Sequence, residues 1–172
     1  MNSFFGNRDE FALEFYDDGK FECWIRGNNI CEYYYNNIKY CTYKPKCEIA
    51  DWFKQNIDAI CSETLFPLNV FGNSSVELYH SSGKYKSDNI DEFSNWYEIR
   101  QDWYFRHSWY ISRNGECLPD VYFRRINDKI EINWYSKDLY DDVYFLYESG
   151  IYYIDFCEFY YIVQKLMLSE IH

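Results

Sequence analysis

Apolar and polar residues alternate over short segments in the first third of the chain, which is the pattern of half-buried β-strands. Phe11–Phe15 and residues 20–25 flank Asp18-Gly19, a dipeptide that is typical of tight hairpin turns. These two segments are therefore predicted to pair. Further strands are predicted at residues 30–35 and 39–43.

Apolar residues recur every three or four positions in two longer segments, which predicts amphipathic helices. The first covers residues 48–61 and the second covers residues 156–171. A shorter helix is predicted from about Ile90, with Ser87 or Asp88 as its N-terminal cap. The apolar residues that define these three helices are Ile49, Phe53, Ile57, Ile60, Ile90, Phe93, Trp96, Phe156, Phe159, Val163, Leu166 and Met167.

The middle of the chain has weaker signals. Residues 72–89 are rich in Ser, Gly and Asn and are predicted as a loop, with a short strand at residues 76–79. Alternation favours a strand over residues 103–112, where Trp103, Phe105, His107, Trp109 and Ile111 would share one face. The same residues are also compatible with a helix, and the two alternatives stay open.

Two hairpins are predicted in the last third of the chain. Residues 121–126 pair with residues 129–134, and residues 144–147 pair with residues 151–154. Together these elements predict an α+β fold, with a mainly antiparallel sheet that is built from hairpins and packed with two or three helices. The length suits a single domain that covers residues 1–172.

Aromatic residues are frequent, with 20 Tyr, 14 Phe and 6 Trp. So many large side chains cannot all be buried, and a tyrosine at the surface is a good contact group for a partner protein. The tyrosine runs at residues 33–35, 152–153 and 160–161 could build a protein-binding face. The alternatives are ordinary packing and a codon bias that enriches Tyr, Asn, Ile, Lys and Phe together.

The net charge of −11 disfavours non-specific binding to the phosphates of nucleic acid. An acidic chain suits a basic protein partner, although the same charge also keeps a protein in solution. The seven cysteines include no Cys-x-x-Cys pair, so neither a metal site nor a cofactor is predicted. The sequence shows neither a signal peptide nor an apolar run of about 20 residues, which predicts a cytoplasmic protein that is not inserted in a membrane.

Candidate chemistry gathers in one part of the chain. The predicted binding residues are Arg106, His107, Asp120, Arg124, Glu131 and Trp134. Pro119-Asp120 followed by Glu131 resembles the PD-(D/E)xK nucleases, in which two carboxylates hold Mg²⁺ and a lysine steers the attacking water. Asn133 stands where that lysine belongs, so no catalytic residue is predicted. The alternative is that the two carboxylates pair with nearby arginines and that His107 is a core histidine.

A second pattern lies in the order of short segments. The chain carries Ile49-Ala-Asp-Trp-Phe-Lys-Gln-Asn56, Glu63, Phe66-Pro67-Leu68, Arg106-His107-Ser108, Leu118-Pro119-Asp120 and Glu131-Ile132-Asn133-Trp134. In this order they resemble the segment that precedes the zinc-peptidase module in some ImmA/IrrE-type bacterial proteins, over about residues 30 to 168. The His-Glu-x-x-His motif of the peptidase is absent. The resemblance implies an accessory module that recognises something, without proteolysis.

These features support three hypotheses about function. The leading one is a non-enzymatic binding or regulatory domain that recognises a protein or a small ligand in bacterial stress, defence or mobile-element biology. The first alternative is an acidic immunity or inhibitor protein that neutralises a basic toxin or nuclease. The second alternative is a degenerate Mg²⁺-dependent nuclease with Asp120 and Glu131 as ligands and with Arg124 or Lys129 in place of the missing lysine.

Overall fold

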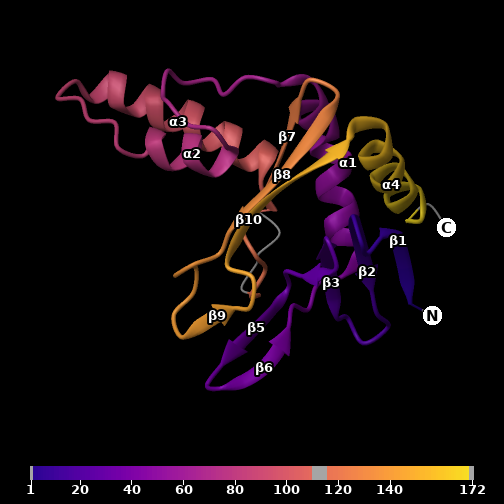
Figure 1. Cartoon of the computed structure of the whole chain (residues 1–172). Coiled ribbons are helices and arrows are strands. Elements are labelled where there is room, and N and C mark those ends of the chain that lie inside the picture. Colours follow the sequence, from indigo (N-terminus) through magenta and orange to yellow (C-terminus); the bar gives the residue numbers. More distant parts are fainter. Residues whose placement is uncertain (1, 110–115, 171–172) are drawn as a thin grey trace.

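The chain forms an α+β fold, as its alternating and helical segments predict (Figure 1). The computed structural model describes residues 2–109 and 116–170. Four helices lie in these residues: α1 (Lys46–Ser62), α2 (Ser75–Ser82), α3 (Ile90–His107) and α4 (Phe156–Leu168). Within the described ranges, none of them combines the length and apolar character that a membrane span requires. The strands are β1 (Ser3–Asn7), β2 (Phe11–Phe15), β3 (Phe21–Ile25), β4 (Asn28–Asn29), β5 (Glu32–Tyr35), β6 (Ile38–Cys41), β7 (Val121–Ile126), β8 (Lys129–Tyr135), β9 (Val143–Phe145) and β10 (Ser149–Asp155).

These strands form three sheets in which all pairs are antiparallel. The first sheet has the order β1-β2-β3-β4, the second β10-β8-β7 and the third β6-β5-β9. The predicted hairpins at residues 11–25 and 121–134 are confirmed as the pairs β2–β3 and β7–β8. The predicted hairpin between residues 144–147 and 151–154 is wrong, because β9 pairs with β5 and β10 pairs with β8. An isolated two-stranded hairpin is marginally stable, and each strand instead adds to a sheet that already has two members.

Phe123 on β7 lies at the centre of the main core. Its ring centroid lies 5.4 Å from that of Phe53 on α1, 5.6 Å from that of Phe159 on α4 and 6.4 Å from that of Phe11 on β2. Four segments that are distant in the sequence therefore meet at one side chain. Removal of these large rings from water is a main source of stability for this core.

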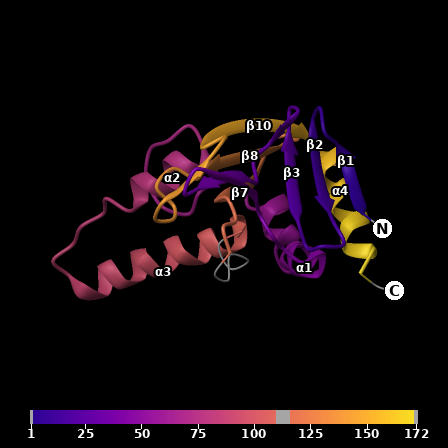
Figure 2. The same cartoon turned by 90° about the horizontal axis from the view of Figure 1, so that it is seen from below.

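The β7–β8 hairpin has a second face, opposite to the one that carries Phe123, and α2 and α3 cover it. Tyr122, the neighbour of Phe123, packs in a second cluster with Val76 of α2 and with Trp103 and Tyr104 of α3. Figure 2 shows α2 and α3 on one side of the hairpin, with α1, α4 and the first sheet on the other. This burial on both faces explains why β7 and β8 contain continuous runs of buried residues.

Residues 76–79 form a helix, so the short strand predicted there is wrong. The side chain of Ser74 caps α2 by accepting the N–H of Glu77, 3.3 Å away. The first two N–H groups of the helix, those of Ser75 and Val76, are bonded by side chains of β8. One of these side chains is Asn133, which accepts from Val76 at 2.8 Å. The Ser74-x-x-Glu77 pattern is a local signal for a helix start that the sequence reasoning missed, and the acceptors from β8 lie far away in the sequence.

Residues 103–107 are the last part of α3, so the helical alternative is confirmed for them. The buried residues are Trp103, Tyr104 and His107, which is the spacing of a helix and not of a strand. The helix begins after Asn89, whose side chain accepts the N–H groups of Asp91 and Glu92, so the predicted caps Ser87 and Asp88 are wrong. Residues 110–112 of the predicted strand lie outside the described residues.

Gly150 on β10 offers a test of how β10 packs against β8. A methyl group at this position would overlap the buried ring of Trp134 on β8. We expect Gly150→Ala to lower the free energy of unfolding by about 1–3 kcal/mol, measured by urea denaturation. Gly83→Ala is the control, because its methyl group would meet the flexible end of Arg100, with Nη2 at 3.1 Å. Equal stability of the two variants would contradict the packing of β10 on β8.

Candidate functional site

Five of the six predicted binding residues form two groups in the structure. Arg106 and His107 lie at the end of α3, beside the end of α1. Asp120, Arg124 and Glu131 lie on the face of the β7–β8 hairpin that α2 and α3 cover. The structure therefore brings Arg106 close to His107 and Arg124 close to Glu131, whereas Asp120 lies further along the hairpin.

Glu63 joins Arg106 and His107 into one cluster. The Arg106 guanidinium donates from Nε to Oε1 of Glu63 at 3.0 Å and from Nη2 to Oε2 at 3.1 Å. Nε2 of His107 lies 3.1 Å from the Glu63 carboxylate, and Nδ1 lies 2.8 Å from the backbone oxygen of Phe123. The buried imidazole is thus fixed between α1 and β7, and the cluster ties the end of α3 to both elements.

Asp120 fastens α3 to the start of β7. The hydroxyl groups of Tyr104 and Tyr122 donate to its carboxylate at 3.1 and 3.0 Å. Burial, and then the charge of Asp120, raise the pKa of Tyr122 well above its usual value. The phenol therefore stays protonated at neutral pH and keeps donating to the carboxylate.

Glu131 attaches α2 to β8. Its completely buried carboxylate accepts the N–H of Ser75 at 2.8 Å, at the start of the helix, where backbone N–H groups and the helix dipole favour a negative charge. Nη2 of Arg124 and the hydroxyl of Tyr153 lie 3.4 Å from the same side chain. A buried carboxylate is costly without partners, and here it has several.

The two carboxylates of the nuclease hypothesis lie apart on the hairpin. Glu131 is the cross-strand partner of Arg124, and Arg124 lies four residues beyond Asp120 along the chain. At about 3.3 Å per residue the two positions are separated by about 13 Å along the strand. The described part of the chain also holds no group of three His, Cys, Asp or Glu side chains arranged for a metal ion. The carboxylates of Asp120 and Glu131 are therefore too far apart to hold one metal ion together, as the nuclease hypothesis requires.

Trp134, the sixth predicted residue, lies on the core face of β8. Its indole N–H donates to the backbone oxygen of Tyr147 at 3.1 Å. A cavity of about 530 Å³ opens beside it, but Asn133 in that cavity already bonds the backbone of Val76 and of Gly150. The contacts of the six residues thus lie within the chain, and their role in binding a partner stays a prediction.

The third sheet, by contrast, presents large side chains to solvent, and we call it the tyrosine sheet (β6-β5-β9). Asn36 and Asn37 connect β5 to β6 with φ of 49° and 60°, the conformation of a type I′ turn. Figure 1 shows this hairpin projecting beyond the other elements. The exposed aromatic and aliphatic residues of the sheet and its flanks are Tyr34, Tyr35, Ile38, Tyr40, Tyr43, Tyr144 and Tyr147.

Acidic residues accompany the tyrosine sheet. Residues 136–148, which lead into β9 and out of it, contain four acidic residues and a single basic one, Lys137. The four carboxylates are exposed, and none pairs with a lysine or arginine of the described residues. They belong to Asp138, Asp141, Asp142 and Glu148. The surface therefore combines phenol rings with uncompensated negative charge.

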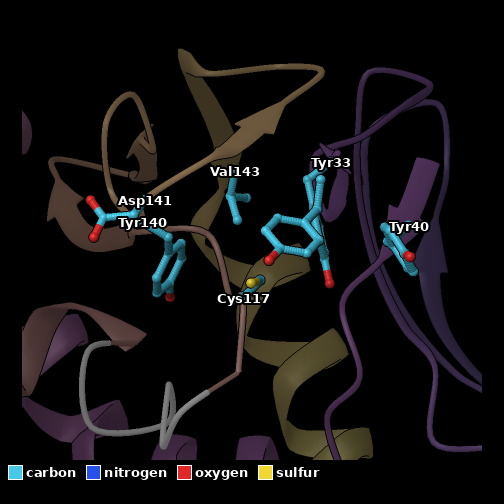
Figure 3. A pocket seen from close by; sticks show the side chains of 7 residues that line it. Tyr33, Tyr40, Cys117, Tyr140, Asp141 and Val143 are labelled. Atoms are coloured by element: carbon cyan, nitrogen blue, oxygen red, sulfur yellow. The ribbon is translucent and has the colours of Figure 1, made fainter. Parts of the chain in front are cut away.

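A cavity of about 430 Å³ opens on one face of the tyrosine sheet (Figure 3). Tyr33 and Tyr40 line it from β5 and β6, and Tyr140 and Asp141 line it from the opposite side, with Cys117 between them. The remaining lining residues are Tyr35 and Val143. Segments from three parts of the sequence thus form one concave, mostly aromatic site.

Only part of this site could be predicted from the sequence. The tyrosine run at residues 33–35 is a predicted contact face, whereas the runs at 152–153 and 160–161 lie elsewhere, on β10 and α4. Sequence reasoning missed five members of the site, namely Tyr40, Cys117, Tyr140, Asp141 and Val143. Val143 joins it because β5 pairs with β9, and a pairing over such a distance leaves no local signal. Cys117 and Tyr140 are held there by hydrogen bonds, from Thr42 to the backbone oxygen of Cys117 at 2.6 Å and from Tyr140 to that of Leu118 at 2.7 Å.

The cluster around Glu63 predicts a dependence of stability on pH. Burial raises the pKa of Glu63, but hydrogen bonds from Arg106 and His107 outweigh it, so that the pKa is lowered overall. A carboxylate with a lowered pKa in the folded state stabilises the fold above its unfolded pKa of about 4.3, and this contribution is lost as the pH falls further.

We therefore expect acid to destabilise the wild-type chain more steeply than Glu63→Gln below about pH 4.3. Thermal unfolding at a series of pH values measures this difference. Glu98→Gln on the exposed face of α3 is the control and should follow the wild type. Parallel pH profiles for wild type and Glu63→Gln would contradict the assignment.

Comparison with known proteins adds one similarity of fold. No protein-family model matches the sequence, and no curated protein is significantly similar to it. The fold is similar to that of a crystal structure of CdiI from Burkholderia dolosa AUO158, with a TM-score of 0.56 and 11% sequence identity. The similarity covers 98% of this chain and 100% of that chain. The resemblance to the ImmA/IrrE accessory segment stays a prediction, and the fold is shared with CdiI along nearly the whole chain.

Proposed function

We propose that this chain is an immunity protein that binds a basic protein toxin and blocks its activity. The observation that carries the proposal is the tyrosine sheet, where exposed phenol rings lie beside carboxylates that have no ion pair among the described residues. The fold supports it, because CdiI is a contact-dependent inhibition immunity protein. At 11% identity this support concerns the fold and not the partner.

Tyrosine suits a recognition surface for physical reasons. Its ring contributes a large contact area with only two rotatable bonds, so little entropy is lost on binding. Tyr34 and Tyr144 are cross-strand partners on β5 and β9, and they extend one exposed face of the sheet. The hydroxyl group of each can also bond polar atoms of a partner.

The charge of the chain favours a basic partner. A net charge of −11 attracts a basic protein over a long range and speeds association, whereas it repels nucleic acid. A toxin that acts on nucleic acid needs a basic surface of its own. An acidic protein that covers this surface would block access of the substrate.

The immunity role is the first alternative that the sequence predicts, and the fold similarity supports it better than it supports the leading hypothesis of a regulatory domain. All seven cysteines are free in the structure, which is typical of a reducing compartment, so the proposal places the protein in the cytoplasm. An accessory module of the ImmA/IrrE type would also bind a ligand. It differs in that it would not neutralise a toxin.

The decisive experiment identifies the partner and tests neutralisation. A pull-down of the tagged chain from its host provides any basic protein that binds in near-equal amount. We expect that protein to arrest growth when it is expressed alone and to lose this effect when this chain is expressed with it. A partner that leaves growth unchanged, or an arrest that this chain does not relieve, would contradict an immunity role.

The four exposed carboxylates beside the tyrosine sheet lead to a second prediction, which concerns the rate of binding. A variant that neutralises all four carries Asp138→Asn, Asp141→Asn, Asp142→Asn and Glu148→Gln. Asparagine tolerates the positive φ of Asp138 and Asp142, so the fold should be kept. We expect association with the captured partner at low salt, measured by stopped flow, to slow about tenfold.

The matched control removes the same charge elsewhere on the surface. It carries Asp9→Asn, Asp58→Asn, Asp88→Asn and Glu98→Gln, all at exposed positions. This variant should associate at a rate closer to that of the wild type. Equal slowing in both variants would show that the tyrosine sheet is not the contact surface, while the immunity role would stand on the growth assay.

A further inference from the structure

We infer that the cavity on the tyrosine sheet receives an arginine side chain of the partner protein. The inference rests on the proposed function, because it names the group of the partner that this site would hold. The cavity, about 430 Å³, opens between β5 and residues 140–143.

The lining matches both parts of an arginine side chain. The face of a tyrosine ring attracts a guanidinium group within about 6 Å, and apolar side chains pack against the methylene stem. Among the described residues that line the cavity, none is basic. The rings and the aliphatic group come from Tyr33, Tyr35, Tyr40, Tyr140 and Val143.

The floor of the cavity is uncharged near neutral pH. Burial, and then the neighbouring Cys117, raise the pKa of Tyr33, and burial raises the pKa of the Cys117 thiol. Both groups therefore stay protonated and neutral, so the floor adds no charge to the lining. The negative charge of the lining belongs to Asp141.

Asp141 acts at the opening of the cavity. Figure 3 shows that its carboxylate points away from Cys117, so its charge does not lie over the floor of the cavity. Asp142 follows it and is also exposed. These two charges would attract a cation toward the opening, and the rings inside would then hold it.

The rings are held in place before a partner binds. The hydroxyl of Tyr140 donates to the backbone oxygen of Leu118 at 2.7 Å. The ring of Tyr33 stacks on that of Tyr40 with centroids 5.8 Å apart and lies 5.6 Å from that of Phe145. Because these side chains are already ordered, little entropy would be lost when a guest enters.

Arginine fits this site better than the other candidates. Its guanidinium is planar, stacks on aromatic faces and is more weakly hydrated than the ammonium of lysine. An apolar side chain would pack against the rings but would gain nothing from the acidic rim. A partner that complements the net charge of −11 is basic and offers arginine on its surface.

The test is an NMR titration of the isotope-labelled full chain. The probe is acetyl-Gly-Arg-Gly-amide, and two matched peptides replace arginine by neutral citrulline or by apolar norleucine. We expect the arginine peptide to shift the amide signals of Cys117, Tyr140 and Val143. It should bind about tenfold more tightly than the citrulline peptide.

Two neighbouring tyrosines provide a matched pair of variants. Tyr34 and Tyr35 are adjacent on β5 and both 43% exposed, but only Tyr35 lines the cavity. We expect Tyr35→Leu to weaken binding of the arginine peptide about fivefold and Tyr34→Leu to leave it unchanged. Equal effects of the two variants, equal affinity for norleucine and arginine, or no shift with any peptide would overturn the inference.

The growth assay separates this inference from the proposed function. Growth rescue without binding of the arginine peptide would overturn only the arginine site. Binding of the arginine peptide without growth rescue would overturn only the immunity role.

Discussion

The burial of the β7–β8 hairpin on both faces is the constraint on which the rest of the structure depends. Phe123 contacts rings of α1, α4 and β2 on one face, while Tyr122 packs against α2 and α3 on the other. Successive side chains of a strand point to opposite faces, so a single strand joins two clusters of buried side chains. Both groups of helices are positioned by this one hairpin.

Burial on both faces also explains the polar residues of the hairpin. A helix that packs on a sheet brings unpaired N–H groups with it, and these need acceptors once water is excluded. Glu131 and Asn133 bond the first N–H groups of α2, and Asp120 accepts the hydroxyl groups of Tyr104 and Tyr122. Residues that resemble a reaction centre in the sequence thus attach two helices to the sheet in the structure.

The tyrosine sheet stands in contrast because no helix covers its outer face in the described part of the chain. Tyr34 and Tyr144 remain exposed there, and the other face opens into the aromatic cavity. Uncompensated carboxylates beside the rings complete a surface that suits a basic protein. The hairpin that is buried on both faces holds the fold together, and recognition is the role that we propose for the exposed sheet.

The sequence by itself determined the local elements whose partners lie nearby, namely the hairpins β2–β3 and β7–β8 and the helices α1 and α4, because periodicity and turn residues act over a few positions. It also determined the acidic charge and the surplus of tyrosine. Tertiary structure supplied the acceptors from β8 that complete the helix over residues 76–79, and it alone decided that β9 joins β5. It also decided which polar residues are covered and which tyrosines meet around Cys117, because burial depends on contacts between segments that are distant in the sequence.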